Sequence, residues 1–254
     1  MSAPVPPAAP VVLVAGATSA IGRAVAAAFA RRGYRVAVAG RNAEETRRIA
    51  ADLALRYRVP AESFRFDALA PDTHEAFVAR VVEWAGDSLR GAVLCYGIMG
   101  DQAQAQRDTA EARRIVDASF TGVASMLEAL ARRLESRGHG FLSAIASVAG
   151  DRGRQSNYVY GSAKAGLAAY LSGLRQRLAS HGVTVTTVKP GFVDTRMTFG
   201  LPGMFLVADP ADVGERIARA CERGTPVLYV PWFWRWIMLI IRLIPERVFA
   251  RLKL

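Results

Sequence analysis

The stretch VVLVAGATSAIG, residues 11–22, carries the signals that decide the fold. Its first half is apolar, which predicts a buried strand, and residues 20–33 follow a helical pattern that ends at Gly33. Gly16 permits a tight turn between the two elements, and Gly22 lets the helix pack close to the strand. We therefore predict that the ordered chain opens with a strand–turn–helix unit.

The same alternation of apolar runs and helical patterns continues along the chain. Further strands are predicted at 34–40, 63–67, 91–97, 141–147, 183–191 and 226–230, and helices at 43–57, from 71, and at 107–136, 156–180 and 210–222. Apolar strands that alternate with helices indicate a parallel sheet covered on both faces. We predict a doubly wound α/β domain with seven strands at 11–230, whose ligands bind at the carboxyl ends of the strands.

Composition narrows the range of partners. The net charge of +11 comes almost entirely from arginine and favours anionic partners such as phosphorylated cofactors or acidic lipid head groups. The arginines are scattered, so no nucleic-acid partner is expected. The two cysteines, Cys95 and Cys221, lack metal-ligand spacing, which predicts a reducing compartment and no metal site. Residues 1–10 form a Pro/Ala tail that we expect to be disordered, and the lack of a positive charge before Arg23 argues against a secretory signal.

The turn after the first strand predicts a dinucleotide site. Its backbone N–H groups and the positive end of the following helix can face a pyrophosphate, and the hydroxyls of Thr18 and Ser19 can add donors. The alternative is a plain glycine-rich turn. The second strand ends in Gly40 and Arg41; an arginine there suits the 2′-phosphate of NADP, so we expect NADPH, with NADH as the alternative. Asp67, after the third strand, would accept a hydrogen bond from the adenine amine or cap the following helix.

A second motif lies in YVYGSAKAGLAAYL, residues 158–171, where Tyr160 and Lys164 are four residues apart. On a helix these side chains share a face, so the Lys164 ammonium would stabilise the phenolate and lower the pKa of Tyr160 from about 10. Such a tyrosine can exchange protons near neutral pH. Ser147, at the end of the fifth strand, could bind the same substrate oxygen. The alternative is a packed tyrosine beside a lysine that reaches for solvent.

The glycine-rich turn, Ser147, Tyr160, Lys164 and the KPG segment at 189–191 together resemble the short-chain dehydrogenase/reductase family over roughly residues 11–230. The resemblance implies a Rossmann-like domain that transfers hydride with NAD(P)H. It implies Tyr160 as general acid/base, Ser147 as the residue that positions the carbonyl, and Lys164 as the residue that lowers the Tyr160 pKa and holds the nicotinamide ribose. The cofactor-binding residues that it implies are Gly16, Thr18, Ser19, Ala20, Ile21, Gly22, Arg41, Asp67, Lys164, Pro190, Gly191, Val193 and Thr195.

Three positions depart from the family pattern. Ala20 replaces the middle glycine of the turn, and residues 95–97 read CYG in place of NAG. Ser119 stands where the family has a catalytic asparagine. In the family, protons pass from Lys164 through a water and a main-chain carbonyl of the helix that carries this asparagine. The serine puts this relay in doubt, unless Ser119 holds a water in its place.

Four stretches are similar to one branch of the family, the reductases that make decaprenylphosphoryl-arabinose from its 2′-keto precursor. They are GATSAIG (16–22), YGIMGD (96–101), VYGSAKAGL (159–167) and the ending from Trp232 onward. The similarity implies a polyprenyl-phosphate keto-sugar as substrate and a separate flavoprotein oxidase as partner, so that the pair acts as an epimerase in cell-wall arabinan synthesis. Asp101 would meet sugar hydroxyls, and an ordinary turn aspartate is an equal alternative.

Residues 231–254 predict amphipathic helices. A bilayer span needs about 20 mostly apolar residues, and the longest uninterrupted apolar run here is 236–241. Arg235 and Arg242 share one helical face, with tryptophan and aliphatic residues around the rest, which suits a water–lipid boundary. We therefore predict a cytoplasmic protein held at the inner face of the plasma membrane. The alternative is a helix packed on the domain or at a subunit interface, because members of the family often form homo-oligomers.

Three functions compete at this point. The first is an NAD(P)H-dependent reductase of a polyprenyl-phosphate keto-sugar. The second is a reductase of another lipophilic ketone, such as a ketoacyl chain or a sterol. The third is a non-catalytic nucleotide-binding scaffold, which only the serine at 119 favours.

Overall fold

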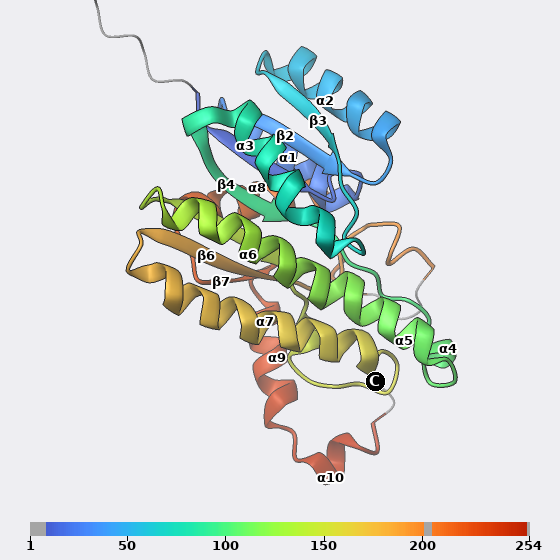
Figure 1. Cartoon of the computed structure of the whole chain (residues 1–254). Coiled ribbons are helices and arrows are strands. Elements are labelled where there is room, and N and C mark those ends of the chain that lie inside the picture. The colour runs from blue at the N-terminus through green and yellow to red at the C-terminus, as the bar shows by residue number, and fades with distance from the viewer. Residues whose placement is uncertain (1–8, 201–204, 253–254) are drawn as a thin grey trace, which may run out of the picture.

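A computed structural model describes residues 9–200 and 205–252 of the chain, so most of the tail predicted at 1–10 lies outside the described residues. The predicted doubly wound domain is confirmed: the described strands form one seven-stranded parallel sheet in the order β3-β2-β1-β4-β5-β6-β7 (Figure 1). The strands are β1 (Val11–Ala15), β2 (Arg35–Gly40), β3 (Ala61–Arg65), β4 (Leu89–Leu94), β5 (Gly140–Ile145), β6 (Val183–Pro190) and β7 (Val227–Val230). The strand order reverses between β1 and β4, which is where such sheets bind ligands.

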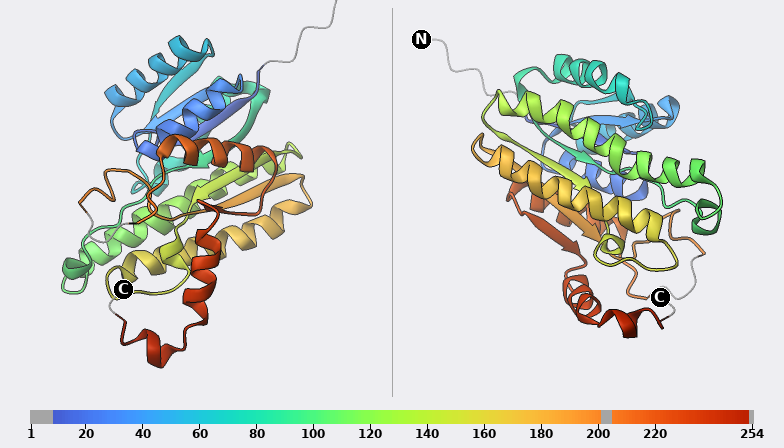
Figure 2. Two further views of the ribbon diagram at one scale, coloured as in Figure 1. Left: turned by 180° about the vertical axis from the view of Figure 1, so that it is seen from behind. Right: turned by 60° about the horizontal axis from the view of Figure 1, so that its bottom comes forward.

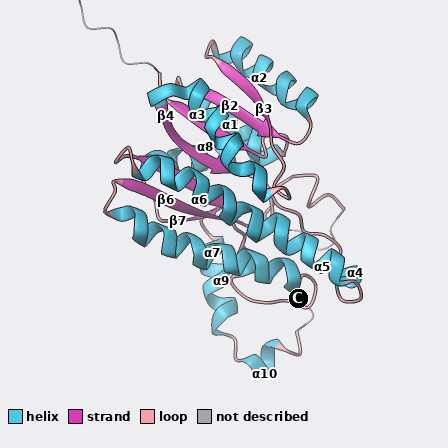
Figure 3. Cartoon of the chain, viewed as in Figure 1, coloured by secondary structure: helices cyan, strands magenta, loops and turns pink. Residues whose placement is uncertain are grey.

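Helices cover both faces of the sheet, as the cyan and magenta layers in Figure 3 show. One layer contains α3 (His74–Ala85), α6 (Gly122–Glu135) and α7 (Tyr158–Ala179), and the other contains α1 (Ala20–Arg31), α2 (Ala43–Tyr57) and α8 (Pro210–Glu222). The view from behind in Figure 2 shows α8 running beside α1. Short helices α4 (Gln102–Ala105) and α5 (Thr109–Val116) precede α6.

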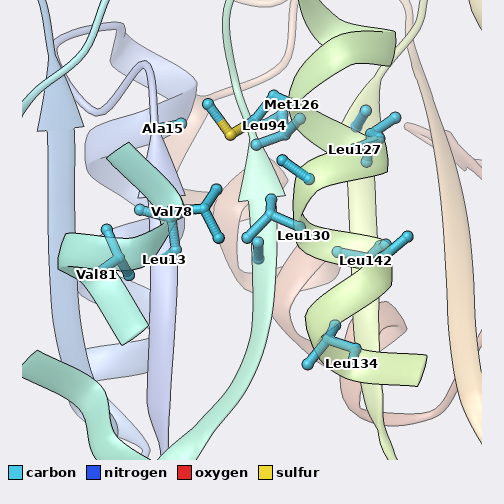
Figure 4. Packing of buried hydrophobic residues seen from close by; sticks show 14 of the residues in the cluster. Leu13, Ala15, Val78, Val81, Leu94, Met126, Leu127, Leu130, Leu134 and Leu142 are labelled. Carbon is cyan, nitrogen blue, oxygen red and sulfur yellow. The ribbon is translucent and has the colours of Figure 1, made fainter. Parts of the chain in front are cut away.

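The core forms because the central strands are apolar on both faces. Leu13 of β1 and Leu94 of β4 point toward α3 and α6, where they meet Val78 and Leu130 (Figure 4). Their neighbours on the strands, such as Val12, pack into a second cluster under α1, α2 and α8. All of these side chains are excluded from solvent. Burial on both faces explains why the strands read as continuous apolar runs.

The helical stretch predicted at 107–136 is present over 109–135, with one irregular turn inside it. The structure divides this segment into α5, a π-helical turn at Asp117–Thr121, and α6. Ser119 lies within the π turn, and its hydroxyl donates to the carbonyl of Ile98 at 2.9 Å. The wider turn therefore brings a helical side chain into contact with the segment after β4, a tertiary contact that helical periodicity does not reveal.

The carboxyl-terminal segment leaves the layered domain after β7 and forms α9 (Trp234–Leu243) and α10 (Glu246–Phe249) at its edge (Figures 1 and 2). Arg152, in the loop between β5 and α7, donates to the carbonyls of Ile241 and Ile244 at 2.7 and 2.6 Å and pairs with Glu246 at 2.8 Å. Its guanidinium also lies 3.8 Å from the ring centre of Phe249. These contacts fix the segment against the loop that leads into α7. Within the described ranges, no helix has the length and apolar character needed to cross a membrane.

Candidate active site

The carboxyl ends of the strands open onto a cavity of about 850 Å³. Segments that follow β1 to β6 all contribute to its wall, as expected for a ligand site in a doubly wound sheet. The predicted residues that line it are Gly16, Thr18, Ser19, Ala20, Ile21, Arg41, Asp67, Ser147, Tyr160, Lys164, Pro190, Gly191, Val193 and Thr195. The structure thus brings together residues from distant parts of the sequence.

The first turn has the geometry of a phosphate cradle. Gly16 has a φ of +78°, and a Cβ there would lie 2.7 Å from the carbonyl oxygen of Cys95. Gly22 is buried and does not line the cavity; a Cβ on it would overlap the Gly16 carbonyl, so its role is to let α1 approach the turn. The Ser19 hydroxyl caps α1 by accepting from Gly22 N at 3.0 Å and donates to Gly16 O at 2.8 Å. The backbone N–H groups of the turn and the N-terminal end of α1 can therefore bind a pyrophosphate. The Ser19 hydroxyl proton is already donated to the Gly16 carbonyl.

The end of β2 explains the absence of a carboxylate at position 40. A Cβ on Gly40 would lie 3.0 Å from the methyl group of Thr46 and 3.3 Å from that of Thr18. A larger side chain would need both to move. Arg41 follows on the exposed rim of the cavity, where a guanidinium can reach a 2′-phosphate. Asp67 is also exposed at this end, and its carboxylate accepts from Leu69 N at 3.0 Å.

Ser147, Tyr160 and Lys164 meet at the other end of the cavity. Ser147 follows β5 by two residues, and the other two side chains come from the first turns of α7. Tyr160 and Lys164 are 8 % and 2 % exposed, and Lys164 Nζ lies 5.7 Å from the centre of the Tyr160 ring. Lys164 also donates to the carbonyl of Ile145 at 2.6 Å. A phenol, a hydroxyl and an amine therefore belong to residues that line the same cavity.

The expected lowering of the Tyr160 pKa is wrong for this structure. Burial raises the pKa of Tyr160 to about 12, and a hydrogen bond with Ser147 opposes that rise only in part. Burial also lowers the pKa of Lys164 to about 8, so the ammonium loses its proton just above neutral pH. Desolvation disfavours the charged form of both groups and is the largest cause of both shifts. The spacing of Tyr160 and Lys164 could be predicted from the sequence, but their exposure to water could not.

Ser119 does not line the cavity. Its hydroxyl donates to the carbonyl of Ile98 at 2.9 Å and accepts from the amide of the same residue at 3.1 Å. A Cβ on Gly97 would lie 3.2 Å from Ser119 Oγ and 3.1 Å from Lys164 Nζ, so the serine and the lysine flank this glycine. Ser119 therefore anchors the segment after β4 to the π turn, and its one proton is committed to that contact.

Asp101 lies apart from the other predicted site residues. It is exposed, does not line the main cavity, and its side chain caps α4 by accepting from Gln104 N at 3.0 Å. This geometry matches the turn-aspartate alternative. The Asp101 carboxylate therefore serves as the N-cap of α4.

The sequence-based predictions omitted several residues of the cavity wall, among them Arg154, Asn157 and Trp234. Arg154 and Asn157 lie in the loop that joins Ser147 to Tyr160, and proximity to those residues was the one available signal. Trp234 comes from α9, where the amphipathic pattern placed it among the lipid-facing residues. The structure buries it at 2 % exposure, packed against Phe192 with ring centres 5.5 Å apart.

Comparison with known proteins defines the class. A family model for short chain dehydrogenases matches residues 10–202. An uncharacterized oxidoreductase of Mycobacterium tuberculosis is 39 % identical over 245 residues, covering 96 % of this chain and 97 % of the relative. An uncharacterized oxidoreductase of Streptomyces coelicolor is 35 % identical over 244 residues, covering 94 % of each chain. The chain therefore belongs to the short-chain dehydrogenase family of NAD(P)-dependent oxidoreductases.

Solved structures agree in fold. A short-chain type dehydrogenase/reductase from Mycobacterium marinum superimposes with a TM-score of 0.79 at 25 % identity, over 87 % of this chain and 93 % of the other. A variant of actinorhodin polyketide ketoreductase with NADPH gives a TM-score of 0.79 at 27 % identity, over 87 % and 95 %. The two oxidoreductase relatives carry no substrate in their names, so the polyprenyl-phosphate branch stays a prediction.

Proposed function

We propose that the protein is an NADPH-dependent reductase of a lipophilic carbonyl compound, and specifically of a keto-sugar on a polyprenyl phosphate. When bound, the reduced dinucleotide supplies a hydride. Ser147 and Tyr160 hold the carbonyl oxygen, and the phenol gives its proton to that oxygen as the alcohol forms. Lys164, in its charged form, stabilises the phenolate left on Tyr160 and would hold the nicotinamide ribose. The phenol then recovers its proton from solvent.

One observation supports the lipophilic substrate above the others: α9 belongs both to the cavity wall and to an exposed apolar surface. Trp234 and Met238 face the domain and are buried. The opposite stripe of the same helix is exposed and apolar; its members are Trp236, Leu239, Ile240 and Leu243, which follow the i, i+3, i+4, i+7 pattern of one helical face. A lipid-bound substrate could pass along this helix from a membrane surface to Tyr160.

The charges around this stripe favour an anionic membrane. Arg235 and Arg242 lie seven residues apart on α9, on the same flank of the stripe, and both are exposed. Arg247 of α10 is exposed as well. Exposed tryptophan and aliphatic side chains bordered by arginine suit the interface of a bilayer with acidic head groups. We therefore propose peripheral attachment at the inner face of the plasma membrane, with a flavoprotein oxidase as the supplier of the ketone.

A second candidate substrate is a ketoacyl chain, because actinorhodin polyketide ketoreductase is among the similar structures. Two assays distinguish the candidates. NADPH oxidation with a polyprenyl-phosphoryl keto-pentose, and not with ketoacyl thioesters, supports the first; the reverse pattern supports the second. A scaffold protein would turn over neither substrate, and a Tyr160→Phe variant would then equal the parent in both assays.

A further inference from the structure

Arg154 carries a charge without an ion-pair partner among the described residues. It lies in the loop between β5 and α7, six residues before Tyr160, and lines the same cavity. Among the residues with described positions, no carboxylate forms an ion pair with it. Asp151 is the nearest acidic residue in the sequence, and it is already paired with Lys189 at 2.5 Å and bonded to the Tyr229 hydroxyl at 2.9 Å.

The guanidinium of Arg154 is held in place by α9. Its Nη2 lies 3.5 Å from the sulfur of Met238, and its Nε is buried without a hydrogen-bond partner in the described part of the chain. Trp234 lies one helical turn before Met238 on the same face of α9, and its indole N–H is also buried and unpartnered there. Arg154 and Trp234 therefore each have one buried N–H group without an acceptor in the described part of the chain, and both residues line the same cavity.

Such an arrangement is costly unless a ligand completes it. Burial lowers the pKa of Arg154, and the nearby charge of Asp151 opposes that shift only in part. A buried donor without a partner loses about 1–3 kcal/mol of solvation, and more when it is charged. The two carboxylates that line the cavity, Asp67 and Asp194, are exposed and do not pair with it.

We infer that Arg154 is the anion-binding residue of the substrate site and that it receives the phosphate of a lipid phosphate. The inference rests on the proposed function, because it takes the cavity beside Tyr160 as the substrate site. A guanidinium suits a phosphate because its planar fork can donate two parallel hydrogen bonds. Asn157, between Arg154 and Tyr160 in the sequence, lines the same cavity, and an amide side chain suits a sugar hydroxyl.

Calorimetry with octyl phosphate tests the inference without turnover. The protein is first saturated with NADP⁺, so that the phosphate sites of the dinucleotide are filled. The parent protein should bind octyl phosphate at least tenfold more tightly than inorganic phosphate, and Arg154→Gln should weaken the binding about 10- to 100-fold. Arg154→Lys should recover part of the loss, because it keeps the charge without the fork.

Arg196→Gln is the matched control, since it removes the same charge from an exposed residue of the same cavity. It should bind octyl phosphate within about twofold of the parent. The thermal unfolding midpoint of Arg154→Gln should not fall, because no ion pair is lost. Equal binding by Arg154→Gln and the parent overturns the inference, as does an equal loss in Arg196→Gln or equal affinity for octyl and inorganic phosphate.

A separate assay keeps the two proposals apart. If octyl phosphate does not bind while the protein reduces a neutral ketone with NADPH, the anion site is wrong and the reductase stands. If octyl phosphate binds through Arg154 and no ketone is reduced, the anion site stands and the proposed function is wrong.

Discussion

Gly191 and Trp234 are in such close contact that a single methyl group on the glycine would overlap the indole nitrogen. Gly191 follows the last residue of β6, and Trp234 is the first residue of α9. The contact therefore joins the predicted nicotinamide end of the cavity to the carboxyl-terminal segment. It explains why a glycine is needed at this position, although its backbone dihedral is not in the left-handed region.

Gly191→Ala should therefore destabilise the protein and lower its reductase activity. The added methyl group forces Trp234 out of its position, and overpacking of this kind costs about 1–3 kcal/mol. Chemical denaturation and NADPH oxidation measure the two effects. Gly173→Ala is the control, because a Cβ on this exposed position of α7 meets no atom. This control should be neutral or stabilise the helix by up to about 1 kcal/mol.

A double-mutant cycle assigns the cost to the indole. Trp234→Ala alone should be destabilising by about 3–5 kcal/mol, because it removes a large side chain that is only 2 % exposed. In that background Gly191→Ala should add little, since the group that it would overlap is gone. An equal cost of Gly191→Ala in both backgrounds would show that Trp234 is not the cause.

The pH dependence of reduction should follow Lys164. Its pKa is lowered to about 8, so it is charged below this pH and neutral above it. Tyr160 has a pKa near 12 and keeps its proton throughout the working range. The value of kcat/KM for a neutral ketone should therefore be constant below about pH 7 and fall as the pH rises through about 8. A rate that stays level to about pH 10 would contradict this assignment.

The sequence predicted the fold because its signals are local. Apolar runs identify buried strands, and the position of Gly16 directly after the first run identifies the turn. Ser147 and Tyr160 could be placed near each other because residues that follow parallel strands meet at one edge of the sheet. Neither of these two predictions depends on how the side chains pack.

The rest of the site depends on tertiary packing. Arg154 and Trp234 became cavity residues only because α9 folds back against the loop before α7, a contact made by Arg152 and the carbonyls at the end of that helix. The pKa of Tyr160 depends on its burial, which spacing along a helix does not specify. The helical pattern after β7 was consistent with packing on the domain and with an exposed apolar surface, and the structure shows both on opposite sides of α9.

Arg41 should determine the preference for NADPH over NADH. Arg41→Asp replaces a cation on the cavity rim with a carboxylate that would repel a 2′-phosphate. We expect kcat/KM for NADPH to fall at least about tenfold and the value for NADH to be equal or higher. Arg47→Asp, on the exposed side of α2, is a charge-matched control that should leave both values unchanged. An unchanged NADPH preference in Arg41→Asp would place the 2′-phosphate elsewhere.

The exposed stripe of α9 should carry membrane attachment, and Ile240→Glu tests it directly. Ile240 is 66 % exposed, so the substitution should not affect folding, but it places a carboxylate in the middle of the stripe. The parent should float with vesicles that contain acidic lipids, and the variant should float at least about fivefold less. A point substitution is preferable to deletion of the segment, because deletion also removes Trp234 from the cavity.

Leu55→Glu supplies the matched control for this experiment. Leu55 is 82 % exposed on α2, far along the chain from the stripe, so its substitution adds the same charge to another exposed apolar position. Flotation of this variant should equal that of the parent, and both variants should reduce a water-soluble ketone at the parental rate. If Ile240→Glu floats as well as the parent, the membrane does not contact α9, and the stripe would instead be available to a second protein surface.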